Sequence, residues 1–196
     1  MRAAVVTKFG DPDVLEVRDV ERPEPKAGEV LIRIEAAGLN RLDHYIREGG
    51  VNPDLEFPFI LGSDAVGVVA EVGSGVTGFN VGDRVIPMPG YPVDPTDDGG
   101  DVLSASPSYT IRGVAENGSY AEYMTAPARW TLKETSGMPA AELATPPMTL
   151  VTAVRAVKVV AEVSQGMKVL LHAGASGTGS MMIQVAKHLG AEVAPT

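Results

Sequence analysis

The sequence contains no cysteine among its 196 residues. This absence excludes disulfides, iron–sulfur clusters, thiol nucleophiles and every zinc site that depends on thiolate ligands. Long apolar runs are also missing, because no stretch approaches the roughly 20 apolar residues that span a bilayer. The N-terminus lacks the basic and apolar regions of a signal peptide. We therefore expect a cytoplasmic protein that has no membrane as a partner.

Basic side chains are scarce relative to acidic ones. The 16 Lys and Arg residues face 25 Asp and Glu residues, which gives a formal net charge of -9. Such a chain is repelled by a nucleic-acid backbone and by an anionic membrane surface. Hydrophobic residues still make up 44% of the chain, which is enough for a buried core. The composition indicates a globular protein whose partner is a small-molecule substrate and not nucleic acid.

Short apolar runs interrupted by Gly, Pro and Asp dominate residues 1–130, a pattern typical of an irregular antiparallel sheet domain. Apolar and polar residues alternate over Glu29–Leu39, which predicts a half-buried strand. Residues Ala65–Val72 form a second β-rich run. In residues 81–85 a Gly-Asp turn pair stands between apolar positions and predicts a hairpin. Together these runs predict a hairpin-built barrel.

A segment rich in Pro, Gly and Asp, residues 87–107, interrupts the sheet pattern. It predicts a loop or lobe without a regular core face. A calcium site is the alternative raised by its aspartates, Asp94, Asp97, Asp98 and Asp101. Their spacing does not match the alternating oxygen ligands of a calcium loop. We therefore expect a solvated acidic loop.

The character of the sequence changes after Pro139. Apolar residues recur at spacings of three and four over residues 150–161, which predicts an amphipathic helix. A continuous apolar run over Val169–Ala173 predicts a buried strand, and a glycine turn and a helix over about residues 180–189 follow it. Another strand begins at Glu192. The order of these elements predicts a β-α-β unit.

The glycine turn between that strand and helix is a candidate cofactor site. Backbone N–H groups at this place in a β-α-β unit receive the diphosphate of a dinucleotide. Gly174 is predicted to supply the tight turn and Gly179 to allow close helix–strand packing, while Ser176 replaces the middle glycine of the G-x-G-x-x-G pattern. A plain strand-to-helix connector is the alternative. The predicted cofactor contacts in the turn are Gly174, Ser176, Gly177, Thr178 and Gly179.

Several segments follow one another in an order that carries a family resemblance. They are Val30–Asn40, Asp43–Gly49, Pro58–Asp64, Val81–Val85, Gly118–Tyr123, Val151–Ala153 and Gly174–Gly179. In this order they resemble the medium-chain dehydrogenase/reductases, in which a GroES-like catalytic domain precedes a Rossmann domain that binds nicotinamide cofactors. The resemblance implies a mixed α and β fold. A GroES-like irregular β-barrel that forms the catalytic and substrate domain is expected over residues 1–130, and a connecting helix with the first β-α-β part of a Rossmann domain over residues 131–196.

Zinc-dependent members of this superfamily have different residues at two positions. Asn40 stands where they have a cysteine, and Ser63 stands where they have a histidine. An amide and a hydroxymethyl group do not replace thiolate and imidazole as Zn²⁺ ligands. The cysteines of a structural zinc site are absent from residues 87–107 as well. The resemblance is therefore nearest to the zinc-independent quinone oxidoreductase branch, and we expect no metal site.

In the quinone oxidoreductase branch, hydride passes directly from reduced nicotinamide to the substrate, while the protein positions both. The resemblance implies NAD(P)H-dependent reduction of a quinone or an α,β-unsaturated carbonyl compound. It implies catalytic roles for Asn40 and Tyr45, and cofactor binding by Asn40 and Thr152. The structural alternatives are a turn amide for Asn40, a partly buried aromatic for Tyr45 and a helix residue for Thr152.

Two other functions stay open at this point. An alcohol dehydrogenase type of oxidoreductase has a similar pattern, and a non-catalytic truncated fragment is expected if the dinucleotide site is incomplete. The residue that selects between NADP(H) and NAD(H) usually lies about 20 residues beyond the glycine turn, outside this sequence, so the residues present do not show the choice. The resemblance alone favours NADP(H), with NAD(H) as the alternative. A short parallel sheet with unpaired edges implies a homodimer or higher self-association.

Overall fold

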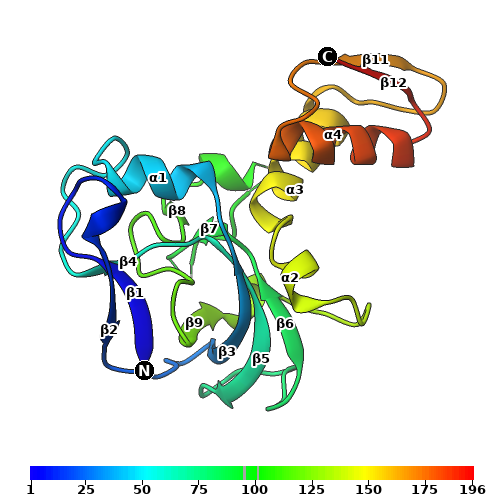
Figure 1. The fold of residues 1–196 in the computed structure, drawn as a ribbon. Coiled ribbons are helices and arrows are strands. Elements are labelled where there is room, and N and C mark those ends of the chain that lie inside the picture. The colour runs from blue at the N-terminus through cyan, green and yellow to red at the C-terminus, as the bar shows by residue number, and fades with distance from the viewer. Residues whose placement is uncertain (95, 101) are drawn as a thin grey trace. The chain divides into compact units, whose positions relative to one another are not determined.

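The computed structural model describes residues 1–94, 96–100 and 102–196 (Figure 1). Contacts between residues divide the chain into two compact units, Met1–Thr145 and Pro146–Thr196. The expected domain boundary after residue 130 stays a prediction. Asp101, one of the aspartates considered for calcium, lies outside the described residues. Within the described ranges, no helix is long and apolar enough to cross a lipid bilayer.

A five-stranded antiparallel sheet forms the centre of the first unit, in the order β10-β6-β5-β3-β9. Its strands are β3 (Glu29–Gly38), β5 (Asp64–Val72), β6 (Arg84–Pro87), β9 (Tyr123–Pro127) and β10 (Thr131–Lys133). The alternation over Glu29–Leu39 predicted β3 and the β-rich run Ala65–Val72 predicted β5, and both strands are present. Register shifts after Leu31 and after Ile34 bend β3 where it pairs with β5. The sheet is therefore a curled half-barrel (Figure 1), in agreement with the predicted mixed α and β fold.

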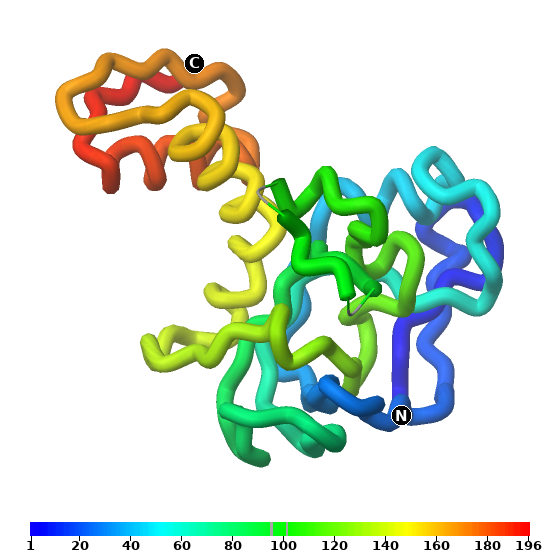
Figure 2. The backbone as a smooth tube through the Cα atoms, turned by 180° about the vertical axis from the view of Figure 1, so that it is seen from behind, coloured from blue at the N-terminus to red at the C-terminus, as the bar shows by residue number. Residues whose placement is uncertain are grey.

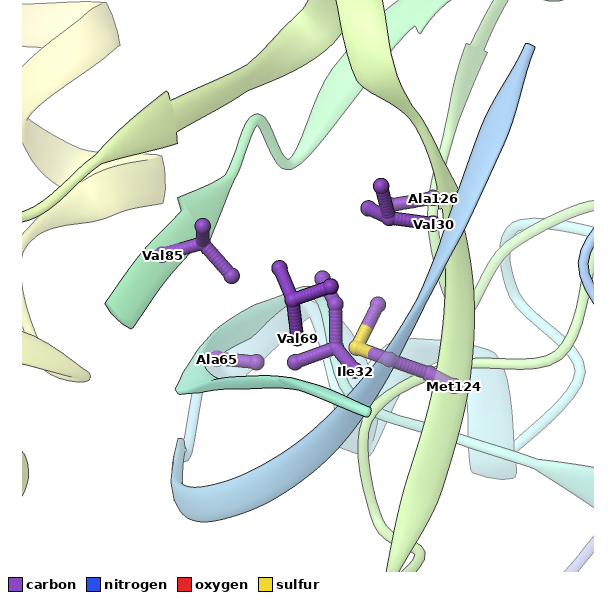
Figure 3. Packing of buried hydrophobic residues seen from close by; sticks show 7 residues of the cluster. All are labelled: Val30, Ile32, Ala65, Val69, Val85, Met124 and Ala126. Carbon is purple, nitrogen blue, oxygen red and sulfur yellow. The ribbon is translucent and has the colours of Figure 1, made fainter. Parts of the chain in front are cut away.

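A tightly packed apolar cluster lies against this sheet. Figure 3 shows its buried side chains, Val30, Ile32, Ala65, Val69, Val85, Met124 and Ala126. They come from β3, β5, β6 and β9, and none is more than 2% exposed. Leu31 lies outside this cluster and is also fully buried. The first part of β3 is therefore more deeply buried than the half-buried strand that its alternation predicted.

A second, three-stranded antiparallel sheet in the first unit has the order β2-β1-β4. Its strands are β1 (Arg2–Val6), β2 (Leu15–Asp19) and β4 (Phe59–Ile60). Short helical segments complete the unit: α1 (Arg41–Arg47), α2 (Ala140–Leu143) and the 3₁₀ turns Pro12–Val14, Leu103–Ala105 and Ala128–Trp130. Helix α1 starts just after β3 ends, so the end of this strand sets the position of α1.

The predicted turn pair Gly82-Asp83 does not join two strands, and this part of the hairpin prediction is wrong. Strands β5 and β6 do pair antiparallel, but residues 73–83 connect them. Gly82 has a φ of +97° and donates its N–H to the carbonyl of Val69 at 2.9 Å. The turn pair therefore leads the chain into β6, and the reversal itself lies earlier in the loop.

The segment predicted as an irregular lobe contains one short strand. Strand β7 (Gly90–Pro92) pairs antiparallel with β8 (Tyr109–Ile111), which follows the lobe. The prediction of a loop or lobe without a regular core face over residues 87–107 therefore missed strand β7. Three residues are too few for an alternation of apolar and polar side chains to be recognised in the sequence.

The carboxylate of Asp97 accepts hydrogen bonds from neighbouring residues of the same segment. Asp97 accepts hydrogen bonds from the hydroxyls of Ser106 and Ser108 and from the N–H of Gly99. These bonds lower the pKa of Asp97 to about 2. Over the residues that the structure describes, no group of histidine and acidic side chains has an arrangement that could hold a metal ion. The described part of the lobe is therefore built as an acidic loop with internal acceptors.

The second unit contains the predicted β-α-β arrangement. Strand β11 (Lys168–Leu171), helix α4 (Gly177–His188) and strand β12 (Glu192–Pro195) follow one another, and the two strands pair in parallel. In both views the strands lie side by side with α4 along one face (Figure 1, Figure 2). Helix α4 begins earlier than the predicted start near Ser180 because Ser176 caps it.

The predicted helix over residues 150–161 is also present, although its geometry changes along its length. Helix α3 (Pro147–Val154) continues into a π-helical segment, Arg155–Val160, whose Val157 is buried in the core of the unit. Leu170 of β11 is 60% exposed. The prediction of a buried strand is therefore wrong for the described chain, because α4 covers one face of this two-stranded sheet and leaves the other open.

Candidate active site

Asn40 occupies the cap position of helix α1. Its backbone is extended, with φ -119° and ψ 150°, and its N–H donates to Oδ2 of Asp43 at 2.7 Å. Asparagine is a preferred residue at this position, and a carboxylate in the first turn satisfies backbone donors there. Gly38 just before it leaves no room for a side chain, because a Cβ atom would lie 2.1 Å from the carbonyl oxygen of Ala144. The chain path into the site is thus fixed by close backbone packing.

The side chain of Asn40 is held by a second carboxylate. Its Nδ2 donates to Oδ2 of Asp64 at 3.0 Å, and Asp64 is fully buried at the start of β5. Ser119 donates its hydroxyl to the backbone carbonyl of Asp64 at 2.8 Å. The structural alternative for Asn40 was a turn amide, and its place at the cap of α1 agrees with that alternative. The bond to Asp64 additionally orients its carboxamide.

Asp43 is buried, with 6% exposure, and its Oδ2 also accepts the hydroxyl of Tyr120 at 2.7 Å. Burial raises the pKa of Asp43 above its usual value, and the bonds from Tyr120, Asn40 and Gly62 oppose this rise. Its other oxygen, Oδ1, has no hydrogen-bond partner among the described residues. Burial and the bond to Asp43 both raise the pKa of the Tyr120 phenol. Tyr120 therefore acts as a donor in this pair.

Ser63 is fully buried, and its hydroxyl takes part in a hydrogen bond within the protein. The Oγ atom donates to the backbone carbonyl of Arg112 at 2.9 Å. The Arg112 side chain donates in turn to the hydroxyl of Tyr91 at 2.6 Å. Ser63 thus links the site to strand β7 of the lobe, and a neutral hydroxyl in this role is a poor ligand for Zn²⁺.

Tyr45 lies on α1 but makes different contacts from Asn40. Its side chain is 44% exposed, and its hydroxyl accepts a hydrogen bond from Nε of Arg41 at 2.9 Å. The Arg41 guanidinium lies 5.7 Å from the centre of the Tyr45 ring, and His44 is its other ring neighbour. Tyr45 is therefore more exposed than the partly buried aromatic of the structural alternative. The structure does not bring Tyr45 into hydrogen-bond contact with Asn40.

Ser176 organises the glycine turn of the second unit. Its Oγ accepts the N–H of Gly179 at 2.9 Å and donates to the carbonyl of Ala173 at 2.8 Å. It is the cap of α4, a role typical of serine. The first N–H groups of a helix have no partner within the helix. With the Gly179 donor taken by Ser176, the N–H groups of Gly177 and Thr178 are the candidates for an anionic ligand.

The glycines of the turn have distinct roles. A Cβ atom at Gly179 would lie 2.1 Å from the carbonyl oxygen of Ala173, which supports the predicted close helix–strand packing. A Cβ atom at Gly174 would lie 2.6 Å from Cβ of Pro195 in β12. The left-handed residue of the turn is Ala173, with a φ of +57°. Gly174 lies within this turn, over residues 172–175, and what the turn requires of Gly174 is space beside β12.

Thr152 lies on α3 and is exposed, with its hydroxyl donating to the carbonyl of Met148 at 3.0 Å. Thr149, one turn earlier, lies beside the start of α4, since its Cγ2 would lie 3.5 Å from a Cβ atom at Gly177. This bond within the helix agrees with the structural alternative for Thr152, an ordinary helix residue. Its hydroxyl oxygen can still accept a hydrogen bond from a ligand.

Asp43 and Tyr120 were not among the predicted catalytic or cofactor-binding residues, although both lie in segments that carry the family resemblance. The spacing of Asn40 and Asp43 is that of a capping box and could have identified Asp43 as a partner of Asn40. No local signal could have identified Tyr120, which reaches Asp43 from 77 positions further along the chain. Its place depends on the pairing of distant backbone segments.

A curled antiparallel β-domain followed by a parallel β-α-β unit with a glycine turn defines the class of protein: a GroES-like domain joined to part of a Rossmann-type fold. The model of the alcohol dehydrogenase GroES-like domain matches residues 26–140. The chain therefore belongs to the medium-chain dehydrogenase/reductase superfamily.

Individual relatives agree with this assignment. A quinone oxidoreductase of Rattus norvegicus is 34% identical over 197 residues, covering 100% of this chain and 52% of that protein. A solved NAD-dependent alcohol dehydrogenase has a TM-score of 0.92 at 39% identity, covering 100% of this chain and 57% of that chain. A mycobacterial protein solved in complex with NADPH has a TM-score of 0.77 at 36% identity, with coverages of 100% and 52%. The chain spans about half the length of these relatives.

Proposed function

We propose that the whole protein is a cytoplasmic, NAD(P)H-dependent oxidoreductase that transfers hydride to a quinone or an α,β-unsaturated carbonyl compound without zinc. The observation that carries the proposal is the replacement of a zinc-ligand set by Asn40 and Ser63, both held in hydrogen bonds to other groups. A site without a Lewis acid suits hydride transfer to a substrate that is already electrophilic.

The residues of the second unit suit a dinucleotide. The N–H groups of Gly177 and Thr178 at the start of α4 would bind its diphosphate, and the close packing at Gly179 keeps this helix end near β11. Gly174 keeps the turn against β12, and Ser176 holds the turn closed through Ala173. When bound, the reduced nicotinamide supplies the hydride.

The residues of the first unit suit the reacting end. Asp64 orients the carboxamide of Asn40, which can then donate a hydrogen bond without losing rotational freedom on binding. Tyr45 would donate a hydrogen bond to the oxygen on which negative charge develops, beside the positive charge of Arg41. Thr152, on α3, would contact the nicotinamide through its exposed hydroxyl.

The residues at the zinc-ligand positions do not fit zinc. Zinc prefers thiolate, imidazole and carboxylate, whereas Asn40 offers an amide and the Ser63 hydroxyl is bonded to the Arg112 carbonyl. Elemental analysis of the purified protein should find less than about one zinc per ten chains. One zinc per chain, removed by a chelator together with activity, would overturn the zinc-independent proposal.

The cofactor test is a titration of the whole protein with NADPH and with NADH, followed through the fluorescence of the reduced nicotinamide. NADPH is the cofactor we favour, and the mycobacterial NADPH complex supports it. The NAD-dependent relative supports NADH as the alternative. An assay against quinones and enals should then show oxidation of the preferred cofactor, and no binding of either cofactor would exclude the proposal.

An alcohol dehydrogenase activity is the second candidate, and the 39% identity to a solved NAD-dependent alcohol dehydrogenase favours it. It predicts reduction of NAD⁺ by simple alcohols and dependence on an added divalent metal. Quinone reduction that persists in a chelator would distinguish the first candidate from the second. A non-catalytic role would show neither activity in the whole protein.

A further inference from the structure

We infer that Tyr120 and Asp43 are positioning residues that fix Asn40 for the reaction. The inference rests on the proposed function, in which the Asn40 carboxamide contacts the cofactor and substrate. Neither Tyr120 nor Asp43 is placed in contact with a ligand. Both act through Asn40, whose backbone N–H and side-chain amide are held by two separate carboxylates, Asp43 and Asp64.

One oxygen of Asp43 carries the arrangement. Oδ2 accepts both the N–H of Asn40 and the hydroxyl of Tyr120, each at 2.7 Å. The other oxygen has no partner among the described residues, and the side chain is 6% exposed. Besides the backbone groups of Asn40 and Gly62, the Tyr120 hydroxyl is the side-chain donor to the Asp43 carboxylate, and its bond to Oδ2 keeps this oxygen turned toward Asn40. A charge-assisted bond of this kind is stronger than a neutral one.

Tyr120 is itself rigidly placed. Gly118, Ser119 and Tyr120 donate their N–H groups to the carbonyls of Ile60, Gly62 and Leu61 at 2.7, 3.0 and 3.0 Å. Gly118 requires glycine, since a Cβ atom would lie 2.2 Å from the Gly62 carbonyl oxygen. Backbone pairing thus fixes the tyrosine against the strand that leads to Ser63 and Asp64.

The same short segment also contacts the backbone of Asp64, the residue that carries the second carboxylate. Ser119 donates to the backbone carbonyl of Asp64, while the next residue, Tyr120, donates to the side chain of Asp43. Residues 118–120 therefore contact both residues that hold Asn40, Asp64 through its backbone and Asp43 through its carboxylate. A segment distant in sequence sets the orientation of the candidate catalytic amide.

The test begins with Tyr120→Phe in the whole protein, which removes the donor and keeps the ring. We expect kcat for quinone reduction to fall about tenfold, with the Kd for NADPH changed less than about twofold. Tyr123→Phe is the matched control. Tyr123 stacks under Arg22, with the guanidinium 4.5 Å from its ring centre, and has no role in the site. Its activity should equal that of the unmodified protein.

The same substitution in an Asn40→Ala background separates positioning from general stability. If Tyr120 acts through Asn40, Tyr120→Phe should cause no further loss of kcat once Asn40 is alanine. An equal loss in both backgrounds would overturn the inference, because it would show an effect independent of Asn40. No loss in the unmodified background would overturn it as well.

A measurement without turnover keeps this inference distinguishable from the proposed function. Hydrogen exchange of the Asn40 backbone amide, followed by NMR, should become about tenfold faster in Tyr120→Phe and stay unchanged in Tyr123→Phe. Faster exchange with no quinone or enal reduction by the unmodified protein would support the positioning role and reject the proposed reaction. Unchanged exchange would reject the positioning role whether or not the protein is active.

Discussion

Asn40 combines a structural and a chemical position in one residue. As the cap of α1 it has an extended backbone, and as an amide bonded to Asp64 it has a fixed side chain. A group held in this way loses little freedom when it binds a ligand. This arrangement costs folding free energy at Asp43, because the carboxylate that bonds the cap is buried and one of its oxygens has no hydrogen-bond partner among the described residues.

The burial of Asp43 predicts a dependence of stability on pH. Its pKa is raised above 3.8 by burial, so between 3.8 and the raised value the folded protein binds more protons than the unfolded chain. The free energy of unfolding contributed by this group therefore falls as pH rises through that window. Asp43→Asn removes the titration. In urea unfolding, its stability relative to the unmodified protein should rise as pH increases from 3.8 through the raised pKa.

Asp83→Asn is the control for this measurement, because the sign of its shift is opposite. Hydrogen bonds from Lys133 and Asn80 lower the pKa of Asp83. Its contribution to stability is present above 3.8 and is lost as pH falls through the lowered value. A relative stability of Asp43→Asn that stays flat, or that falls with rising pH, would contradict the raised pKa.

The glycine turn gives a second prediction at the residue scale. Gly179→Ala would place a Cβ atom 2.1 Å from a backbone oxygen, whereas Gly177→Ala would meet its nearest atom at 3.5 Å. We expect Gly179→Ala to weaken NADPH binding by the whole protein at least about tenfold, and Gly177→Ala to weaken it far less. Fluorescence titration measures both. Equal affinities in folded variants would show that the turn is only a connector.

At the scale of elements, helix α4 depends on its cap. Ser176→Ala removes the acceptor of the Gly179 N–H, and we expect the second unit to lose about 1 kcal/mol of stability. Ser180→Ala is the control in the same helix, because the Ser180 hydroxyl only donates back to the Gly177 carbonyl. Urea unfolding followed by far-UV circular dichroism compares them. If Ser180→Ala lowers the free energy of unfolding as much as Ser176→Ala does, the cap contributes no more to stability than another serine of the helix.

Periodicity predicted the elements that are long and have one buried face. Strand β3 alternates over enough residues to be recognised, and the apolar spacing over residues 150–161 predicted a helix. Strand β5 was predicted from its β-rich composition. Strand β7 was missed because it has three residues, and the start of α4 was placed too late because the cap at Ser176 was not used as a signal. Sequence pattern therefore predicted the long elements, but it did not predict the three-residue strand or the position of the helix cap.

The long-range contacts of the site were not readable from local pattern. The hydroxyl of Tyr120 meets Asp43, and that of Ser63 meets the carbonyl of Arg112 49 positions further along the chain. Such contacts follow from strand pairing between distant segments, which depends on the whole sheet. The family resemblance named Asn40 and Ser63 as positions of interest, but it did not indicate what they bond to here.

At the scale of the whole molecule, the second unit predicts self-association of the 196-residue chain. Its two-stranded parallel sheet has an open face, and Leu170 on that face is 60% exposed. Parallel sheets are normally covered on both faces. We expect dimers or larger species at about 100 µM in size-exclusion chromatography with light scattering, and fewer of them in Leu170→Lys.

Val81→Lys is the control for Leu170→Lys, since Val81 is 68% exposed in the first unit and far from the second unit in sequence. It should leave the distribution of species unchanged. A chain that stays monomeric across this concentration range, with or without Leu170→Lys, would refute the expectation.

The division into two units also separates the chromophores of the protein from its glycine turn. The single tryptophan, the five tyrosines and the four phenylalanines all precede residue 146, where the second unit begins. Intrinsic fluorescence and near-ultraviolet spectra therefore report on the first unit alone. The unfolding of α4 is visible only to methods that detect the backbone. A thermal melt that looks like one transition by tryptophan emission can thus conceal the earlier loss of the glycine turn, and both signals must be recorded to follow this protein as it unfolds.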